Sequence, residues 1–273
     1  MDLDDALSQL ANDPAASCDL AEVALRLAVD EYPTLDVEAH LSELDGMAHE
    51  VQSYLRGSLQ ARVSGLCRYL FHEMGFRGNQ EDYYDPRNSY FNQVLDRKTG
   101  IPITLSTLVM AVGERAGLRV LGVGLPGHFL AKAVKGDEEI LFDPFHGGRL
   151  LDVEQCERLV QRVTRTPFVA TPETLDALPI GFIVQRMLAN LKGIYLRQSD
   201  FTRASRVIER LLQLTPGDTF QNRDLGIALI HAGQTGRALD HLKAYLASAP
   251  NADDAHAVQD MLRRASAEVA RWN

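Results

Sequence analysis

The C-terminal third of the chain repeats itself with a period of 34 residues. Three pairs of identical residues share this separation: Leu191 and Leu225, Ala204 and Ala238, and Pro216 and Pro250. A period of this length predicts stacked helix pairs, because each pair buries its apolar face only against the next pair. The small alanines allow the two helices of a pair to approach closely, and each proline follows the second helix and prevents its continuation.

A 34-residue period with these positions is typical of tetratricopeptide repeats. We predict two such repeats and a closing cap helix over residues 181–273, with the segment from Asp253 to Trp272 as the cap. Arrays of this kind offer a surface to a protein or peptide, so we expect the partner to bind there. Residues 166–180 contain three prolines and are interpreted as the linker that precedes the array.

The part before this linker, residues 1–165, is expected to be a single α+β domain. Apolar residues recur at helical spacing through residues 1–75, which predicts a helical N-terminal part. Residues 76–165 form the predicted α+β core, in which a helix runs from about Thr104 to about Gly117. Three short β-type runs follow, at residues 119–125, 128–134 and 138–144, and the turns between them predict a small antiparallel sheet.

Charge and composition exclude several classes of partner. The net charge is −9, and the first fifty residues hold thirteen acids against one base, Arg26, which argues against nucleic-acid binding. No apolar run reaches the length of a membrane span, and the N-terminus lacks the pattern of a signal peptide. The odd count of three cysteines, without a CxxC pair, disfavours disulfides and structural zinc. We therefore expect a cytoplasmic chain without a membrane partner.

Residues 100–148 carry the chemistry-bearing motifs. They resemble the core of the transglutaminase-like superfamily, whose papain-like fold has a Gly-x-Cys at a helix start, then a strand with His and a strand with Asp. The resemblance implies that His128 in PGHFL and Asp143 in FDP are the catalytic imidazole and carboxylate. It places the nucleophile in Gly100-Ile101-Pro102, so Pro102 stands where the cysteine is expected. A proline suits the first turn of a helix but cannot act as a nucleophile.

The whole chain is similar to the bacterial SirB-type family, in which a transglutaminase-like domain precedes tetratricopeptide repeats. The segments that carry this resemblance are EYPTLDVEAHL, FRGNQEDYYDPRNSYFNQVLDRKTGIPITLS, GLPGHFL, DPFHGG and the repeat region. The family has no firmly assigned reaction, so the resemblance implies the fold rather than an activity. A similar domain in a eukaryotic F-box protein suggests an adaptor role by analogy.

Three other residues are candidates for a nucleophile. Cys67 lies in an imitation of a GxCR motif, but it shares an apolar helical stripe with Val63 and Leu70, and we expect it to be buried and inert. Thr104 and Ser106 lie near the start of the predicted helix, where a hydroxyl could point toward His128. Thr104 fits a capping role equally well.

The sequence also suggests which residues line the cleft of this domain. The polar, aromatic segment 79–89 is expected to line it through Asn79, Tyr84, Asp85 and Asn88, or else to be a hydrogen-bonded loop that braces the sheet. Asn88 or Ser89 is also available to cap the helix that follows.

Pro102 and His146 complete the predicted cleft. His128, Asp143 and His146 could together hold a metal, but their spacing fits no standard signature, so we expect no metal and no cofactor.

Two functions from different classes remain open. The leading hypothesis is a non-catalytic binding or adaptor protein, a pseudoenzyme whose cleft and repeat surface each engage a peptide partner. The alternative is a hydrolase or acyl-transfer enzyme that uses His128 and Asp143 with Thr104, Ser106 or an activated water. Pro102 favours the first hypothesis, and the retained histidine and aspartate support the second.

Overall fold

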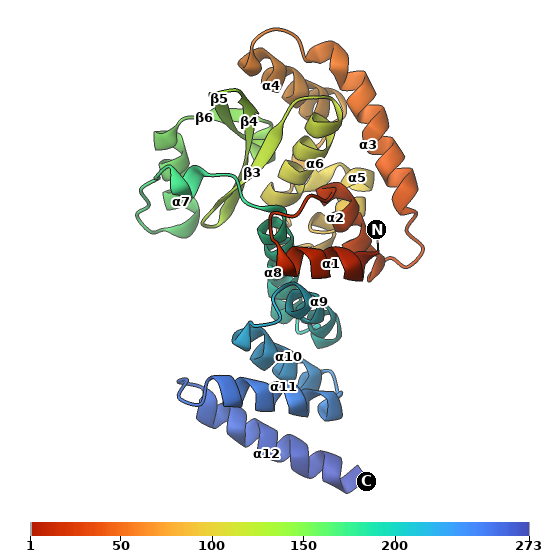
Figure 1. The fold of residues 1–273 in the computed structure, drawn as a ribbon, viewed down its shortest axis with the longest axis vertical. Helices are drawn as coiled ribbons and strands as arrows, with labels where there is room; N and C mark the ends of the chain where they lie inside the picture. The colour runs from red at the N-terminus through yellow and green to blue at the C-terminus, as the bar shows by residue number, and fades with distance from the viewer. Residues whose placement is uncertain (1, 273) are drawn as a thin grey trace. The chain divides into compact units, whose positions relative to one another are not determined.

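The structure, a computed structural model, describes residues 2–272 and is mixed α+β (Figure 1). The chain forms two compact units. The first contains the residues up to Ala6 together with Pro14–Met187, and the second contains Leu7–Asp13 together with the residues from Leu188 onward. None of the helices within residues 2–272 is both long and apolar enough to span a bilayer.

Side-chain caps define where several helices of the N-terminal part begin. Asp19, Asp36 and Ser58 each accept a hydrogen bond from a backbone N–H in the first turn of the helix they precede, which satisfies a donor that has no intrahelical partner. The helices of this part are α1 (Leu3–Asn12), α2 (Leu20–Val29), α3 (Val37–Val51) and α4 (Leu59–Cys67). Together they confirm the helical N-terminal part expected from the apolar stripes.

The predicted sheet is present and has one strand more than expected. Strands β3 (Val120–Leu125), β4 (His128–Lys135), β5 (Glu138–Asp143) and β6 (Arg149–Leu151) form an antiparallel sheet in that order. The first three match the predicted β-type runs, and the short β6 was not predicted. A separate parallel pair joins β1 (Arg77–Gly78) to β2 (Thr99–Gly100), which leads toward α6 (Pro102–Arg115).

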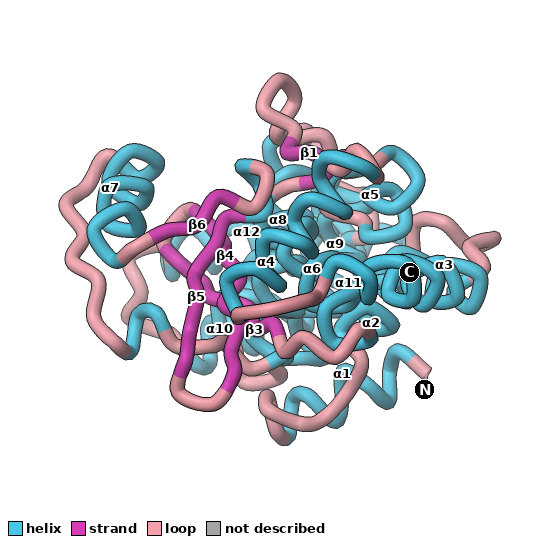
Figure 2. The backbone as a smooth tube through the Cα atoms, turned by 90° about the horizontal axis from the view of Figure 1, so that it is seen from above, coloured by secondary structure: helices cyan, strands magenta, loops and turns pink. Residues whose placement is uncertain are grey.

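Helices cover both faces of the four-stranded sheet (Figure 2). Six successive residues of β4 are buried, as expected for a strand with both faces covered. Helix α6 contacts β3 and β4. Helix α7 (Val153–Thr164), on the other face, contributes Cys156, Leu159 and Val160 to a core shared with β3 and β4.

The predicted linker, residues 166–180, lies within the first unit. Leu175 is buried in the core beneath α7, and the backbone N–H of Leu178 donates a hydrogen bond to the carbonyl of Gly122 in β3. These contacts hold the segment against the sheet.

The C-terminal part is entirely helical over residues 181–272 apart from its turns, as the 34-residue period predicts. Ala204 and Ala238 are both fully buried, in α9 and α11. Those two helices end at Leu214 and Ser248, which are separated by one repeat. The helices are α8 (Ile180–Arg197), α9 (Phe201–Leu214), α10 (Thr219–His231), α11 (Thr235–Ser248) and α12 (Ala255–Trp272). Figure 1 shows α10, α11 and α12 stacked in sequence.

Candidate functional site

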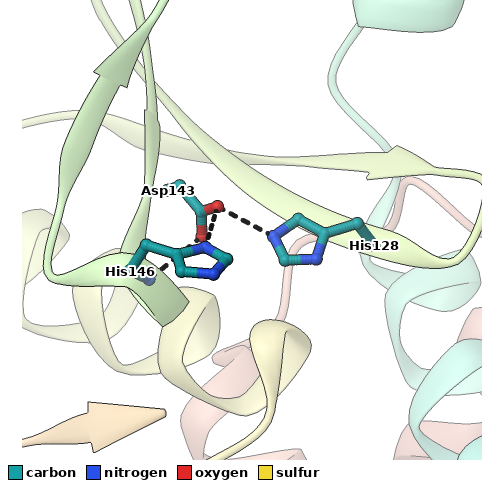
Figure 3. Close-up of side chains that lie close together, drawn as sticks. All are labelled: His128, Asp143 and His146. Carbon is teal, nitrogen blue, oxygen red and sulfur yellow. Dashed lines mark hydrogen bonds and ion pairs between the residues drawn. The ribbon is translucent and has the colours of Figure 1, made fainter. Parts of the chain in front are cut away.

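His128 and Asp143 meet at one end of the four-stranded sheet. His128 is the first residue of β4 and Asp143 is the last residue of the adjacent β5. Nε2 of His128 lies 3.0 Å from Oδ2 of Asp143, and both side chains are buried (Figure 3). The expectation that the two side chains lie on adjacent strands within hydrogen-bond distance is confirmed.

A tight turn and one arginine fix the position of His128. Pro126 and Gly127 connect β3 to β4, and Gly127 has a φ of +68°, a backbone conformation that glycine adopts without strain. The guanidinium of Arg186 donates hydrogen bonds of 2.9 Å to the carbonyls of both Leu125 and His128. Arg186 therefore ties together the two ends of the turn that presents the imidazole.

His146 is the second imidazole at this carboxylate. It ends the short helix η4 (Pro144–His146), which begins immediately after Asp143, whose Oδ1 accepts the backbone N–H groups of Phe145 and His146. Nδ1 of His146 lies 2.7 Å from Oδ2 of Asp143. The two imidazole rings are stacked with centroids 5.9 Å apart, so one carboxylate organises both (Figure 3).

The carboxylate of Asp143 is held in its charged form. Burial alone would raise the pKa of Asp143, but hydrogen bonds from His128 and His146 outweigh burial and hold the pKa below its usual range. A charged carboxylate only accepts, so Nε2 of His128 must carry the proton in this bond. Among residues 2–272, Nδ1 of His128 has no hydrogen-bond partner, which leaves it available as a base or acceptor.

The start of α6 lies beside η4. Gly78 of β1 packs so closely against Phe145 that an added Cβ would lie 2.6 Å from its ring. Strand β1 pairs with β2, and β2 leads into α6, which itself contacts η4. Pro102, which the sequence resemblance predicts to stand at the nucleophile position, is the first residue of α6 and is buried. Proline lacks a backbone N–H, but the helix loses no hydrogen bond here, because the N–H groups at the first helical positions have no intrahelical acceptor.

The two candidate hydroxyls on α6 differ in their surroundings. Oγ1 of Thr104 accepts a hydrogen bond from the N–H of Ile101 and donates one of 2.8 Å to the carbonyl of Asn88. Thr104 therefore closes the first turn of the helix. Oγ of Ser106 is buried and has no hydrogen-bond partner within the described chain. Neither hydroxyl is bonded to an imidazole there.

Cys67 is buried, as its apolar stripe predicted. It is the last residue of α4, where the backbone continues into the π-helix η2 (Arg68–Glu73). Burial raises the pKa of the Cys67 thiol to about 12. Its Sγ lies against Gly148, where a Cβ would approach within 2.2 Å of the sulfur. A thiol in this environment is protonated at neutral pH and is a poor nucleophile.

The polar segment 79–89 forms a hydrogen-bonded loop. Asn88 is fully buried, and its side chain bonds to Asn79 and to the carbonyl of Asp82. Asp85 caps the short helix η3 (Pro86–Asn88) and forms an ion pair with Arg97. The expectation that Asn88 or Ser89 caps the next helix is wrong, because α5 (Phe91–Arg97) begins after Tyr90 without a side-chain cap and Asn88 points inward to the loop.

Only part of this loop reaches the histidines. Tyr84 is exposed, whereas its neighbour Tyr83 packs edge-on against Phe145 with ring centroids 6.1 Å apart. Phe145 in turn packs edge-on against His128 at 6.0 Å. Tyr83 and Phe145 were not singled out in the sequence, although aromatic residues next to a motif histidine are a usable signal.

A cleft of about 90 Å³ opens beside Asp143 and His146. Its other walls come from β6 and from one face of α7, and they include three arginines that the sequence reasoning did not select: Arg149, Arg158 and Arg162. The side chain of His146 is 39% exposed, whereas that of Asp143 is only 2% exposed.

The three side chains at the centre form a possible metal site. One ligand atom from each of His128, Asp143 and His146 lies within 4.8 Å of the other two. Two imidazoles and a carboxylate are a donor set that zinc accepts, with a fourth position left for water. The same arrangement is explained without a metal, because both imidazoles donate to the carboxylate at hydrogen-bond distances.

Comparison with known proteins identifies two families within the chain. Residues 38–189 match the transglutaminase-like superfamily, and residues 191–263 match a tetratricopeptide repeat family. A UPF0162 protein of Xylella fastidiosa is 35% identical over 257 residues, which cover 89% of this chain and 88% of that protein.

Two more distant likenesses cover different shares of the chain. Mouse F-box only protein 21 is 33% identical over 161 residues, or 55% of this chain and 25% of the mouse protein. A crystal structure of menin aligns with 89% of this chain and 69% of its own, at 12% identity and a TM-score of 0.40.

Proposed function

The chain belongs to the transglutaminase-like superfamily, among the bacterial UPF0162 proteins, and from this membership we propose that it is a non-catalytic binding or adaptor protein. The main support for this proposal comes from the chemical nature and the surroundings of the nucleophile candidates. Pro102 has no nucleophilic atom, and Cys67 is buried with a pKa of about 12. Thr104 is engaged in helix capping, and the buried hydroxyl of Ser106 is bonded to no imidazole within residues 2–272. The cleft then keeps an imidazole pair and a carboxylate without the cysteine nucleophile that the transglutaminase-like pattern leads us to expect.

The tetratricopeptide part supplies the second binding surface. A groove of about 400 Å³ lies between α10 and α12, with Ile230, Ala257 and Met261 among its apolar residues and Asp260, Arg264 and Glu268 among its charged ones. A mixed lining of this kind suits an amphipathic peptide segment of a partner protein. We propose the functional division expected from the sequence, with residues 1–165 holding the cleft, 166–180 the linker and 181–273 the repeat surface.

A pair of matched variants tests the repeat surface. Ala257 lies in the groove, and Gln259 is exposed on the same helix outside it. In a quantitative capture experiment with the immobilised full-length chain, Ala257→Arg should lower the amount of bound partner by at least about tenfold, and Gln259→Arg should not. Equal capture by both variants would contradict a role for this groove.

The second candidate function is hydrolysis by an activated water, which the three clustered ligand atoms of His128, Asp143 and His146 favour. An assay with simple thioesters, esters and amides, with and without added zinc, separates it from the first. The binding proposal predicts no turnover above that of the His128→Ala variant. Turnover that disappears in His128→Ala would overturn the non-catalytic role.

A further inference from the structure

The cleft beside His146 collects cationic side chains from two separate elements. Arg149 lies on β6, and Arg158 and Arg162 lie on α7. In the sheet register Arg149 is paired directly with Asp143, so its position relative to the two histidines is set by the β5–β6 ladder. On α7, residues 158 and 162 are four apart and therefore share one helix face.

The orientation of α7 is fixed at its first turn. The side chain of Asp152 accepts a hydrogen bond of 2.7 Å from the N–H of Gln155, and the side chain of Gln155 accepts one of 2.9 Å from the N–H of Asp152. This capping box holds the start of the helix, while Cys156 and Leu159 anchor its inner face in the core. The arginines are therefore presented by a rigid helix and a paired strand.

The three arginines outnumber the one acid that lines the cleft, Asp143. The carboxylate of Asp143 already accepts hydrogen bonds from both imidazoles and from two backbone N–H groups. Arg158 forms an exposed pair with Glu154, the kind of contact that contributes little stability and yields readily to a competitor. Within residues 2–272, Arg149 and Arg162 form no ion pair.

The cationic surface continues outward along α7. A more open hollow of about 430 Å³ is lined by Arg158, Gln161, Arg162 and Arg165. The inner cleft of about 90 Å³ has room for roughly three waters, each occupying about 30 Å³ in the liquid. A carboxylate or phosphate group fits the inner cleft, and the rest of the molecule that carries it fits the outer hollow.

We propose that this cleft binds an oxyanion, a carboxylate or a phosphate group, carried by the ligand of the transglutaminase-like domain. Guanidinium groups suit this ligand, because their planar arrays of N–H donors match the paired oxygens of both anions. The inference rests on the proposed binding role of this cleft and names the chemistry that the cleft selects.

Two probes distinguish the sources of the anion in titration calorimetry of the full-length chain. The first is inorganic phosphate. The second is an N-acetylated tripeptide with uncharged side chains and a free C-terminal carboxylate, compared with the same peptide as its C-terminal amide. We expect at least one of the two anions to bind, the amide not to bind, and the affinity to fall as sodium chloride screens the arginines.

Matched variants decide whether the binding is at this cleft. Arg162→Gln and Arg149→Gln, on different elements, should each weaken the affinity by about tenfold, which corresponds to about 1.4 kcal/mol. Arg56→Gln removes an exposed arginine from the first unit outside the cleft and should change the affinity by less than about twofold. No binding of either anion, or an equal loss in Arg56→Gln, would overturn the inference.

Failure of the oxyanion site and failure of the proposed function give different experimental results. His128-dependent turnover would overturn the non-catalytic role and leave an arginine-dependent oxyanion site intact. Absence of anion binding together with partner capture that is sensitive to Ala257→Arg would overturn only the oxyanion site.

Discussion

Asp143 is the residue on which the candidate site depends most. Its two oxygens accept hydrogen bonds from His128, His146 and two backbone N–H groups, so one carboxylate orients both imidazoles and caps the short helix η4. A buried charge without such partners would carry a large desolvation cost. The network is satisfied only while the carboxylate is ionised, so the stability of the site should depend on pH.

The Asp143→Asn variant tests this dependence. The native pKa of Asp143 lies below its unfolded value of about 3.9, so its ionised form stabilises the fold above that pH. At pH 7 the variant should lose about 3 kcal/mol in urea unfolding, because each imidazole loses a charged acceptor. As the pH falls below about 4, the carboxylate of the unfolded wild-type chain takes up a proton while the native one stays ionised, so the stabilisation and the difference from the variant should both shrink. A difference in unfolding free energy between wild type and variant that stays constant from pH 7 to pH 3 would contradict the link between the ionisation of Asp143 and stability.

We expect the reactivity of the three cysteine thiols to depend on their burial rather than on the GxCR-like motif around Cys67. Burial raises the pKa of Cys67 to about 12 and that of Cys156 to about 11, whereas Cys18 is only partly buried. Under native conditions at pH 7.5, iodoacetamide should label Cys18 first and leave the other two until the chain unfolds. Mass spectrometry of peptides from timed samples measures the order. Labelling of Cys67 as fast as that of Cys18 would show that the sulfur is accessible.

At this scale, the sequence indicated the side chains that act through local motifs. The proximity of His128 and Asp143 could be predicted because His128 begins one strand of a hairpin and Asp143 ends the other. Arg186 could not be predicted, because it bonds to the carbonyl of a residue 58 positions away. The same holds for Arg162, whose proximity to His146 depends on how α7 packs against the sheet, whereas Arg149 is placed by the pairing of the unpredicted β6 with β5. Contacts between distant segments leave no local periodicity to detect.

The proposed absence of a nucleophile can be tested on helix α6. Pro102→Cys would place a thiol at the N-terminus of this helix, beside η4, where the helix dipole and a nearby imidazole lower a thiol pKa below about 8.5. The new thiol should therefore alkylate faster than Cys67 at neutral pH. Stability should change little, because proline at the first helical position donates no hydrogen bond.

The double variant Pro102→Cys/His128→Ala is the control for this experiment. Removal of the imidazole should slow alkylation of the introduced thiol, as followed by the pH dependence of its rate. If the thiol reacts slowly and is unaffected by His128→Ala, then Pro102 does not occupy the ancestral nucleophile position. The hydroxyls of Thr104 and Ser106 would then become the candidates to test.

Some elements were predictable and others were missed for identifiable reasons. The β3, β4 and β5 runs were found because the turns between them contain Pro126-Gly127 and Gly136, which mark strand ends. Strands β1 and β2 have two residues each, too few for an alternating pattern. Helix α7 was overlooked although it carries a usable signal, since Asp152 and Gln155 have the spacing of a capping box.

For the molecule as a whole, the 34-residue period was the most reliable guide. It predicted the helical C-terminal part because each helix pair repeats the same buried positions, such as Ala204 and Ala238. The division into compact units falls between Met187 and Leu188, inside α8. No break in composition marks that division, since one continuous helix passes through it. Packing between distant segments, rather than local sequence, determines where one core ends and the next begins.

We expect helix α12 to act as the cap of the repeat array. Val258 of α12 is buried with Leu242 and Tyr245 of α11, so this helix closes the last apolar face. Truncation after Asp254 should expose that face and destabilise the array by about 3 kcal/mol. Hydrogen exchange followed by mass spectrometry should show faster exchange in α10 and α11 and unchanged protection in β3, β4 and β5. Equal loss of protection in the sheet would mean that the two units unfold together, and unchanged α11 would mean that α12 is not its cap.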